Sequence, residues 1–146
     1  MDGGGGRIRR YLIVANQTLS GGALLAKVRE LRDAGPCRFH IVVPATPPHD
    51  HAYTDAEAHR IARERLEVGL HRLRDLGVDV TGEVGDEHPV SAVKDVLDRE
   101  PFDEIIVSTL PPRISKWLRA DLPHRVAGFG LPVSHVEGRA EPVTPT

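Results

Sequence analysis

Residues suited to binding an anion gather in the last third of this chain. Ser108 and Thr109 end an apolar run, and the segment after them carries basic side chains at Arg113, Lys116, Arg119, His124 and Arg125. Cationic side chains donate charge-assisted hydrogen bonds to phosphate or carboxylate groups. The alternative is that these side chains form the solvated face of a short helix. No Ser-His-Asp order or nucleophile-elbow pattern surrounds Ser108 and Thr109, so we expect helix capping or ligand contact there rather than catalysis.

Histidines and one cysteine are the other residues with reactive side chains. His49, Asp50 and His51, with His59 further along, have imidazole and carboxylate groups of the kind that bind metals. They lie in or next to a proline-containing loop, where a solvated segment is the simpler interpretation, so we predict no metal site. Cys37 precedes an apolar run and has no histidine fixed beside it, which favours a partly buried thiol over a nucleophile. We therefore assign no catalytic residue.

The elements that must position these residues alternate between apolar runs and amphipathic segments. Strands are predicted at 8–15, 38–43, 104–108 and 132–136, and the alternating stretch 78–84 predicts another at a sheet edge. Helices are predicted between Ser20 and Gly35, between Thr54 and Gly77, and between Pro89 and Pro101. Ser20 is the expected cap of the first helix, and Thr54 forms a capping box with Glu57 in the second. A broken helical stretch is expected at 114–127.

This alternation predicts an α/β fold, a single-domain three-layer sandwich with a five-stranded parallel sheet covered by helices on both faces. Right-handed crossovers leave few topologies. We expect the strand order 3-2-1-4-5, a flavodoxin-like, Rossmann-like topology shared with adenine nucleotide α-hydrolase-like proteins. In such sheets, ligands bind at the carboxyl ends of the strands where the strand order reverses. Here that crevice lies between strands one and four, at 15–17 and 108–110.

Composition limits the classes of function. The formal net charge is −2, so no basic excess favours nucleic-acid binding. No apolar run approaches the roughly 18 residues that span a bilayer, and no signal peptide is visible. A single cysteine excludes an internal disulfide, so we expect a cytoplasmic protein. We expect the glycine-rich leader at 1–7 and the tail at 137–146 to be disordered, which leaves 8–136 as the folded domain.

Several stretches of the sequence together carry a family resemblance. Leu12 to Asn16 reads as a hydrophobic strand, Gly85-Asp86 precedes a helix that starts with Pro89, residues 102–108 read FDEIIVS, and residues 124–133 end in Pro-Val. Over 8–136 these features resemble the universal stress protein (UspA) family. That family has a first strand ending in Asp, a Gly-Asp-Pro helix start, a Tyr-Asp-Leu-Ile-Val-Val-Gly strand, and a closing helix followed by a Pro-Val strand. Asn16 departs from the acidic residue of the family.

The resemblance implies a nucleotide site that this sequence alters. ATP-binding members of the family carry Gly-x-x-Gly and a later Gly-Ser or Gly-Thr pair after the fourth strand. In this chain Ser108, Pro111 and the pair Ala120-Asp121 stand at those positions. A phosphate cradle needs free backbone N–H donors, and proline has none. We expect Asp121 to cap a helix through its side chain and to repel a phosphate there.

The expected ligand-binding residues combine the crevice, this loop and the second strand, where backbone groups near Val42 and Val43 would contact adenine. They are Ala15, Asn16, Gln17, Val42, Val43, Ser108, Thr109, Arg113, Ala120 and Asp121. The resemblance implies a small binding or regulatory module of the stress response rather than a turnover enzyme. ATP, AMP or another adenine nucleotide is the candidate ligand, with ATP bound weakly or not at all. The alternatives are an adenine-nucleotide-binding protein with slow hydrolase activity and a partner-binding domain with an empty site.

The last predicted strand, 132–136, suggests a homodimer. It lies at a sheet edge in the expected order, and an edge strand has unpaired backbone groups that invite another chain. Antiparallel pairing of two copies would give a two-fold contact with His135 close to the axis. The resemblance agrees with this, since UspA-like proteins often associate through this strand.

Overall fold

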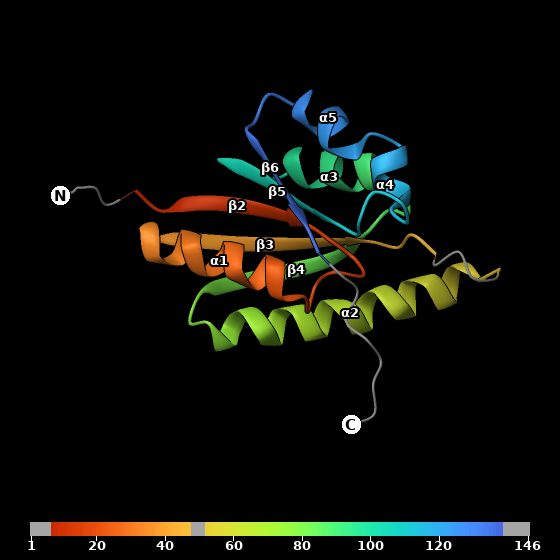
Figure 1. Cartoon of the computed structure of the whole chain (residues 1–146), viewed down its shortest axis with the longest axis horizontal. Helices are drawn as coiled ribbons and strands as arrows, with labels where there is room; N and C mark the ends of the chain where they lie inside the picture. Colours follow the sequence, from red (N-terminus) through yellow and green to blue (C-terminus); the bar gives the residue numbers. More distant parts are fainter. Residues whose placement is uncertain (1–6, 48–51, 139–146) are drawn as a thin grey trace.

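The computed structural model describes residues 7–47 and 52–138. Residues 1–6 of the predicted leader, 139–146 of the predicted tail, and His49, Asp50 and His51 of the candidate metal segment lie outside the described residues. Strands and helices alternate along the described chain (Figure 1). In order they are β2 (Arg9–Val14), α1 (Gly22–Ala34), β3 (Cys37–Pro44), α2 (Asp55–Asp75), β4 (Asp79–Gly85), α3 (Pro89–Leu97), β5 (Glu104–Thr109), α4 (Lys116–Arg119), α5 (Leu122–Ala127) and β6 (Val133–Glu137).

The strands form one five-stranded parallel sheet in the order β4-β3-β2-β5-β6. Counted along the described chain, this is the predicted order 3-2-1-4-5, so the predicted fold class is confirmed. β2 lies at the centre, where Ile13 pairs with Ile41 of β3 and with Ile106 of β5. β4 and β6 form the two edges, in agreement with the positions expected for the third and last strands.

Helices cover both faces of the sheet (Figure 1). α1 and α2 lie on one face, and α3, α4 and α5 lie on the other. Successive strand residues point to opposite faces. Ile13 therefore packs in the core beneath α1 and α2, while Leu12 and Val14 pack in the core beneath α3 and α5. Within the described residues, no helix has both the length and the apolar composition needed to cross a membrane.

The starts of α2 and α1 confirm one predicted cap and contradict another. The predicted capping box of α2 is confirmed: Glu57 N donates to Thr54 Oγ1 at 3.1 Å, and Thr54 N donates to Glu57 Oε1 at 2.9 Å. The prediction that Ser20 caps α1 is wrong, because the N-cap is Gly21 and no side chain caps the helix. Gly21 N donates to Thr18 O at 3.0 Å, so a turn holds the residues before the helix and delays its start.

Gly85 allows α3 to pack closely on the sheet. It is the last residue of β4, and a Cβ atom placed on it would lie 2.8 Å from Ala92 Cβ of α3 and 2.9 Å from Val42 Cγ2 of β3. Both distances are shorter than carbon atoms tolerate without displacement. The glycine of the Gly85-Asp86 pair therefore has a packing role.

Replacement of Gly85 by alanine is expected to destabilise the fold by about 1–3 kcal/mol, the usual cost of overpacking a core. Gly22→Ala is the matched control, because a Cβ on this first residue of α1 meets nothing within 4 Å. Urea unfolding of both variants measures the difference. If Gly85→Ala is as stable as the wild type, α3 does not depend on this close approach.

Candidate functional site

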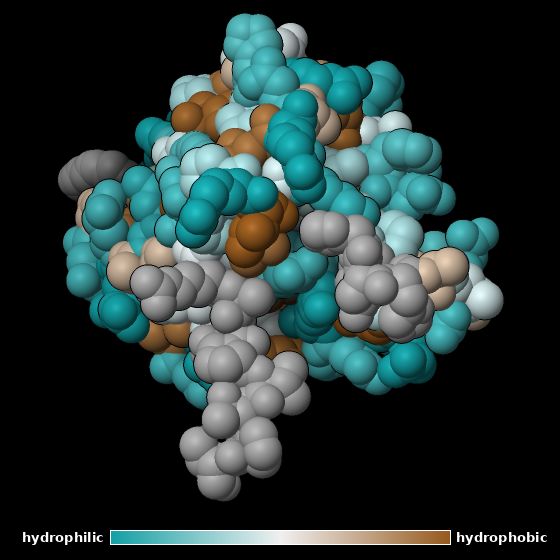
Figure 2. Space-filling view, turned by 45° about the vertical axis from the view of Figure 1, so that its right-hand side comes forward, coloured by the Kyte–Doolittle hydropathy of each residue, from teal (hydrophilic) through white to brown (hydrophobic). Residues whose placement is uncertain are grey.

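A cleft lies at the carboxyl ends of β2 and β5, where the strand order reverses. Its empty space is about 440 Å³, part of it open to solvent. It is lined by Asn16, Gln17, Thr18, Thr46, Pro47, Ser108, Thr109, Leu110, Ile114, Ser115, Lys116 and Trp117. Figure 2 brings this side of the molecule forward and shows hydrophilic side chains over most of it, with separate apolar patches between them.

Buried hydroxyl groups of the cleft lining hold the ends of the strands together through hydrogen bonds. Thr18 and Ser108 are 2% and 1% exposed, and their hydroxyl oxygens lie 2.5 Å apart. This hydrogen bond ties the loop after β2 to the end of β5. Thr109 Oγ1 lies 2.6 Å from His135 Nε2 of β6, and Gly138 N donates to Thr109 O at 2.9 Å. The strand ends are therefore held together by side chains as well as by the sheet.

Asn16 joins the cleft to two other elements. Its Nδ2 donates to Pro44 O at the end of β3 at 2.8 Å. Its Oδ1 accepts a hydrogen bond from the Arg65 guanidinium of α2. Both ends of the side-chain amide are thus engaged within the protein, so Asn16 fixes the geometry of the cleft and brings Arg65 next to it.

The other wall comes from the segment after β5. Ser115 caps the short helix α4, since its Oγ accepts a hydrogen bond from Leu118 N at 3.1 Å. The next residue, Lys116, reaches across the cleft, and its Nζ lies 3.5 Å from Pro47 O. Trp117 is partly buried against the core beneath α3 and α5, which agrees with a packing role. A cation therefore lies at the mouth of the cleft, opposite the end of β3.

The structure separates the predicted ligand-binding residues into two groups. Asn16, Gln17, Ser108 and Thr109 line the cleft together, as does Leu110 of the predicted crevice. The others are not among its described lining: Ala15, Val42 and Val43 are 0% exposed within the sheet region, and Arg113, Ala120 and Asp121 lie on the surface beyond the cleft. Contact of this second group with a ligand stays a prediction.

The expected side-chain cap by Asp121 is wrong. Asp121 does occupy the N-cap position of α5, but its backbone is left-handed, with φ 58° and ψ 41°, and its side chain makes no capping hydrogen bond. Side-chain capping requires an extended backbone that turns the carboxylate toward the first N–H groups of the helix. The left-handed conformation of Asp121 does not provide this.

Sequence reasoning missed Arg65, although the sequence contains a signal for it. Ala58, Ala62, Gly69 and Leu73 are buried residues of α2. They follow one another by four, seven and four residues, the spacing of one face of a helix. Arg65 follows Ala62 by three positions and precedes Gly69 by four, so it falls on this inward face. A charged residue on such a face needs a polar partner, and Asn16 is that partner.

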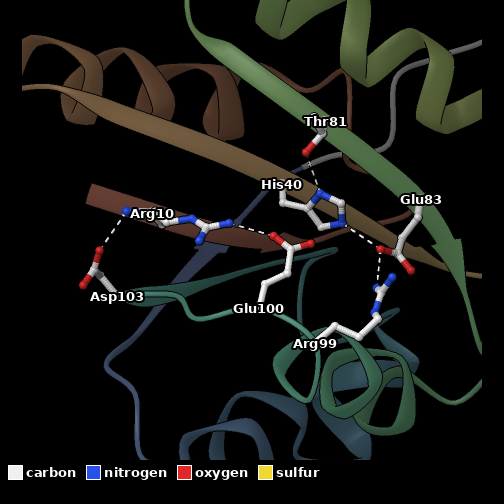
Figure 3. A network of polar contacts seen from close by, with 7 residues as sticks. All are labelled: Arg10, His40, Thr81, Glu83, Arg99, Glu100 and Asp103. Atoms are coloured by element: carbon white, nitrogen blue, oxygen red, sulfur yellow. Dashed lines mark hydrogen bonds and ion pairs between the residues drawn. The ribbon is translucent and has the colours of Figure 1, made fainter. Parts of the chain in front are cut away.

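A second group of polar residues lies on the face of the sheet that α3 covers (Figure 3). His40 of β3 contacts two residues of β4: its Nδ1 lies 2.6 Å from Thr81 Oγ1, and its Nε2 lies 2.8 Å from Glu83 Oε1. Arg99 also donates to Glu83 Oε1, at 2.5 Å. Nearby, Arg10 pairs with Glu100 at 2.7 Å. Each carboxylate of this network has a cationic partner, so the network satisfies its own charges.

Burial and hydrogen bonding act in opposite directions on Glu83. Burial alone would raise the pKa of its carboxyl group, but hydrogen bonds from Arg99 and His40 outweigh burial, and the pKa is lowered. A carboxyl group whose pKa is lower in the folded than in the unfolded state stabilises the fold above its unfolded pKa. That contribution is lost as the pH falls through the folded pKa.

Three solved structures that are similar to this chain are of universal stress proteins. One from Archaeoglobus fulgidus has a TM-score of 0.59 at 13% identity, over 88% of this chain and 93% of its own. One from Burkholderia pseudomallei has a TM-score of 0.62 at 14% identity, over 90% and 97%. A third, in complex with cAMP, has a TM-score of 0.57 at 14% identity, over 91% and 98%. No protein-family model matches the chain, and no curated protein matches its sequence. The chain therefore has the universal stress protein fold that its sequence resemblance implied.

Replacement of Glu83 by glutamine is expected to destabilise the protein by about 1 kcal/mol at pH 7, a value that allows for solvent screening of a partly exposed pair. The difference from wild type should begin to shrink as the pH falls below the unfolded pKa of about 4.3, and it should vanish only below the lowered folded pKa, where the carboxyl group is protonated in both states. Thermal unfolding at pH 7 and pH 3 measures it. Glu64→Gln, which removes an exposed partner of Arg60 on α2, should change stability by less than about 0.5 kcal/mol at pH 7. A loss in Glu83→Gln that is equal at both pH values would contradict the account.

Proposed function

We propose that this chain is a universal stress protein-like binding or regulatory module whose cleft takes an adenine nucleotide or nucleoside. The observation that carries the proposal is the cleft at the strand-order reversal, whose described lining is rich in hydroxyl and amide groups and contains no acidic side chain. Neutral donors and acceptors of this kind suit a base and its sugar. The complex of a structurally similar universal stress protein with cAMP supports the same ligand class. On the same resemblance we assign the module to the stress response and to the cytoplasm.

The loop after β5 supports an altered phosphate site. Pro111 and Pro112 have no N–H group to offer a phosphate. Ile114 N and Ser115 N both donate to Pro111 O at 3.0 Å, so these N–H groups are used within the loop. A triphosphate would find few free backbone donors there. We therefore expect this cleft to favour a ligand with less phosphate than ATP.

A slow nucleotide hydrolase is the second candidate. The contact of Thr109 Oγ1 with His135 Nε2 at 2.6 Å favours it, since an imidazole can accept a proton during attack on phosphorus. Enzymatic phosphoryl transfer from ATP also relies on a metal ion that neutralises the phosphates. The described lining of the cleft has no carboxylate to hold that ion. Phosphate release from ATP in magnesium buffer that is lost in His135→Ala would favour the hydrolase over the binding module.

The choice of ligand is the first test of this proposal. AMP is expected to bind the full chain measurably, and ATP more weakly or not at all, because the loop after β5 lacks free backbone donors. Isothermal titration calorimetry in magnesium buffer with AMP, adenosine and ATP measures all three affinities. Micromolar affinity for ATP would contradict the altered phosphate site. Absence of binding by AMP and adenosine alike would contradict the nucleotide assignment itself.

We also propose a homodimer through β6. Pro132 O accepts a hydrogen bond from Ile105 N, and Gly138 N donates to Thr109 O, so even-numbered residues of this strand face β5. Bonded and free backbone groups alternate along a strand that is paired on one side. The N–H group of His135 is therefore directed outward, toward a second copy of the chain.

His135→Pro should convert the dimer to a monomer, because proline removes this outward donor without removing a bond to β5. His135→Ala is the matched control, since it loses the same imidazole and keeps the N–H group, and it should remain a dimer. Light scattering at high protein concentration measures the mass of each. A monomeric wild type, or a dimer that persists in His135→Pro, would exclude this interface.

A further inference from the structure

Arg65 differs from the other cations of the described chain. Four described Lys and Arg residues are partly buried rather than exposed: Arg10, Lys27, Arg32 and Arg65. The first three are paired with Glu100, Glu30 and Asp33 respectively. Arg65 has no carboxylate partner among the described residues, and its guanidinium donates a hydrogen bond to the neutral amide of Asn16.

A partly buried guanidinium that lacks a carboxylate partner raises the free energy of the folded state. Burial lowers the pKa of the Arg65 guanidinium below its usual value, and the nearby Tyr53 opposes this effect. A partly buried cation is poorly compensated by a neutral amide alone, because an amide oxygen carries only a partial charge. A guanidinium has five N–H donors in a planar fork that matches the oxygens of a phosphate or carboxylate. Asn16 uses one of these donors, which leaves others for an anion.

Arg65 is not itself among the residues that line the cleft, but its hydrogen bond to Asn16 places it next to one that is. Asn16, its partner, lines the cleft, and Lys116 lies at the opposite wall. No acidic residue is among the described lining, so no carboxylate there offsets the charge of Lys116 or that of the adjacent Arg65. The chain as a whole has a net charge of −2, but this local excess of positive charge favours an anionic ligand over a neutral one.

We propose that Arg65 pairs with a phosphate monoester of the bound ligand, and that this contact replaces the glycine-rich phosphate loop. The proposal rests on the proposed function, since it specifies which group of the nucleotide the cleft recognises. The phosphate would lie beside Asn16, between the end of β2 and α2, and away from the proline-containing loop after β5. Arg65 is thus the residue that distinguishes a nucleoside monophosphate from the free nucleoside.

The test compares AMP with adenosine on the full chain by titration calorimetry. The wild type should bind AMP at least about tenfold more tightly than adenosine, the effect expected of one charge-assisted contact. Arg65→Gln should remove this preference and leave adenosine affinity within about threefold of wild type. Arg63→Gln is the matched control, because it removes the same charge from an exposed position on the same helix. It should keep the preference for AMP.

Each outcome bears on the proposal. Equal affinity of the wild type for AMP and adenosine would overturn it, whatever the variants do. Equal losses of AMP affinity in Arg63→Gln and Arg65→Gln would also overturn it, because a general charge effect would then explain both. Arg65→Lys keeps the charge and should keep part of the preference, which covers the case that the glutamine variant does not fold. If neither AMP nor adenosine binds, the proposed function itself fails, and that result differs from equal binding of the two.

Discussion

The central place of β2 in the sheet is the constraint on which the rest of the structure depends. β2 pairs with β3 on one side and β5 on the other, so the segments that follow β2 and β5 leave the sheet at neighbouring points. The first turns toward α1 on one face, and the second turns toward α4 on the opposite face (Figure 1). Because the two connections diverge, neither helix layer covers the gap between them. The cleft is therefore a consequence of the topology, and its chemistry depends on the few residues that follow each strand.

The two polar groups of the structure show how charge distinguishes a structural network from a candidate binding site. Around His40, the carboxylate of Glu83 is shared by an imidazole and the Arg99 guanidinium, so this charge is paired within the protein. Around Asn16, the Arg65 guanidinium bonds to a neutral amide and has no carboxylate partner among the described residues. The first arrangement stabilises the sheet beneath α3. The second leaves positive charge next to a cleft, which is why it points to a ligand.

The sequence allowed the fold to be predicted because its signals are local. Apolar or alternating runs marked the strands, and the pair Thr54 and Glu57 marked the start of α2. The observed elements differed from the predicted ones in local backbone details. A turn moves the start of α1 to Gly22, and Asp121 has a left-handed conformation. Topology then brought the predicted Asn16 and Ser108 to one cleft. Arg65 and Lys116 were not grouped with Asn16, since α2 and α4 meet the end of β2 only through tertiary packing that no short motif records.

A crystal structure of the protein with AMP tests the central claim most directly, because it locates the phosphate group. The account predicts AMP in the cleft at the ends of β2 and β5, with phosphate oxygens within hydrogen-bond distance of the Arg65 guanidinium. The base and sugar would then contact the hydroxyl and amide groups that line the cleft. An AMP phosphate bound at the loop that contains Pro111 and Pro112, with Arg65 still bonded only to Asn16, would contradict it.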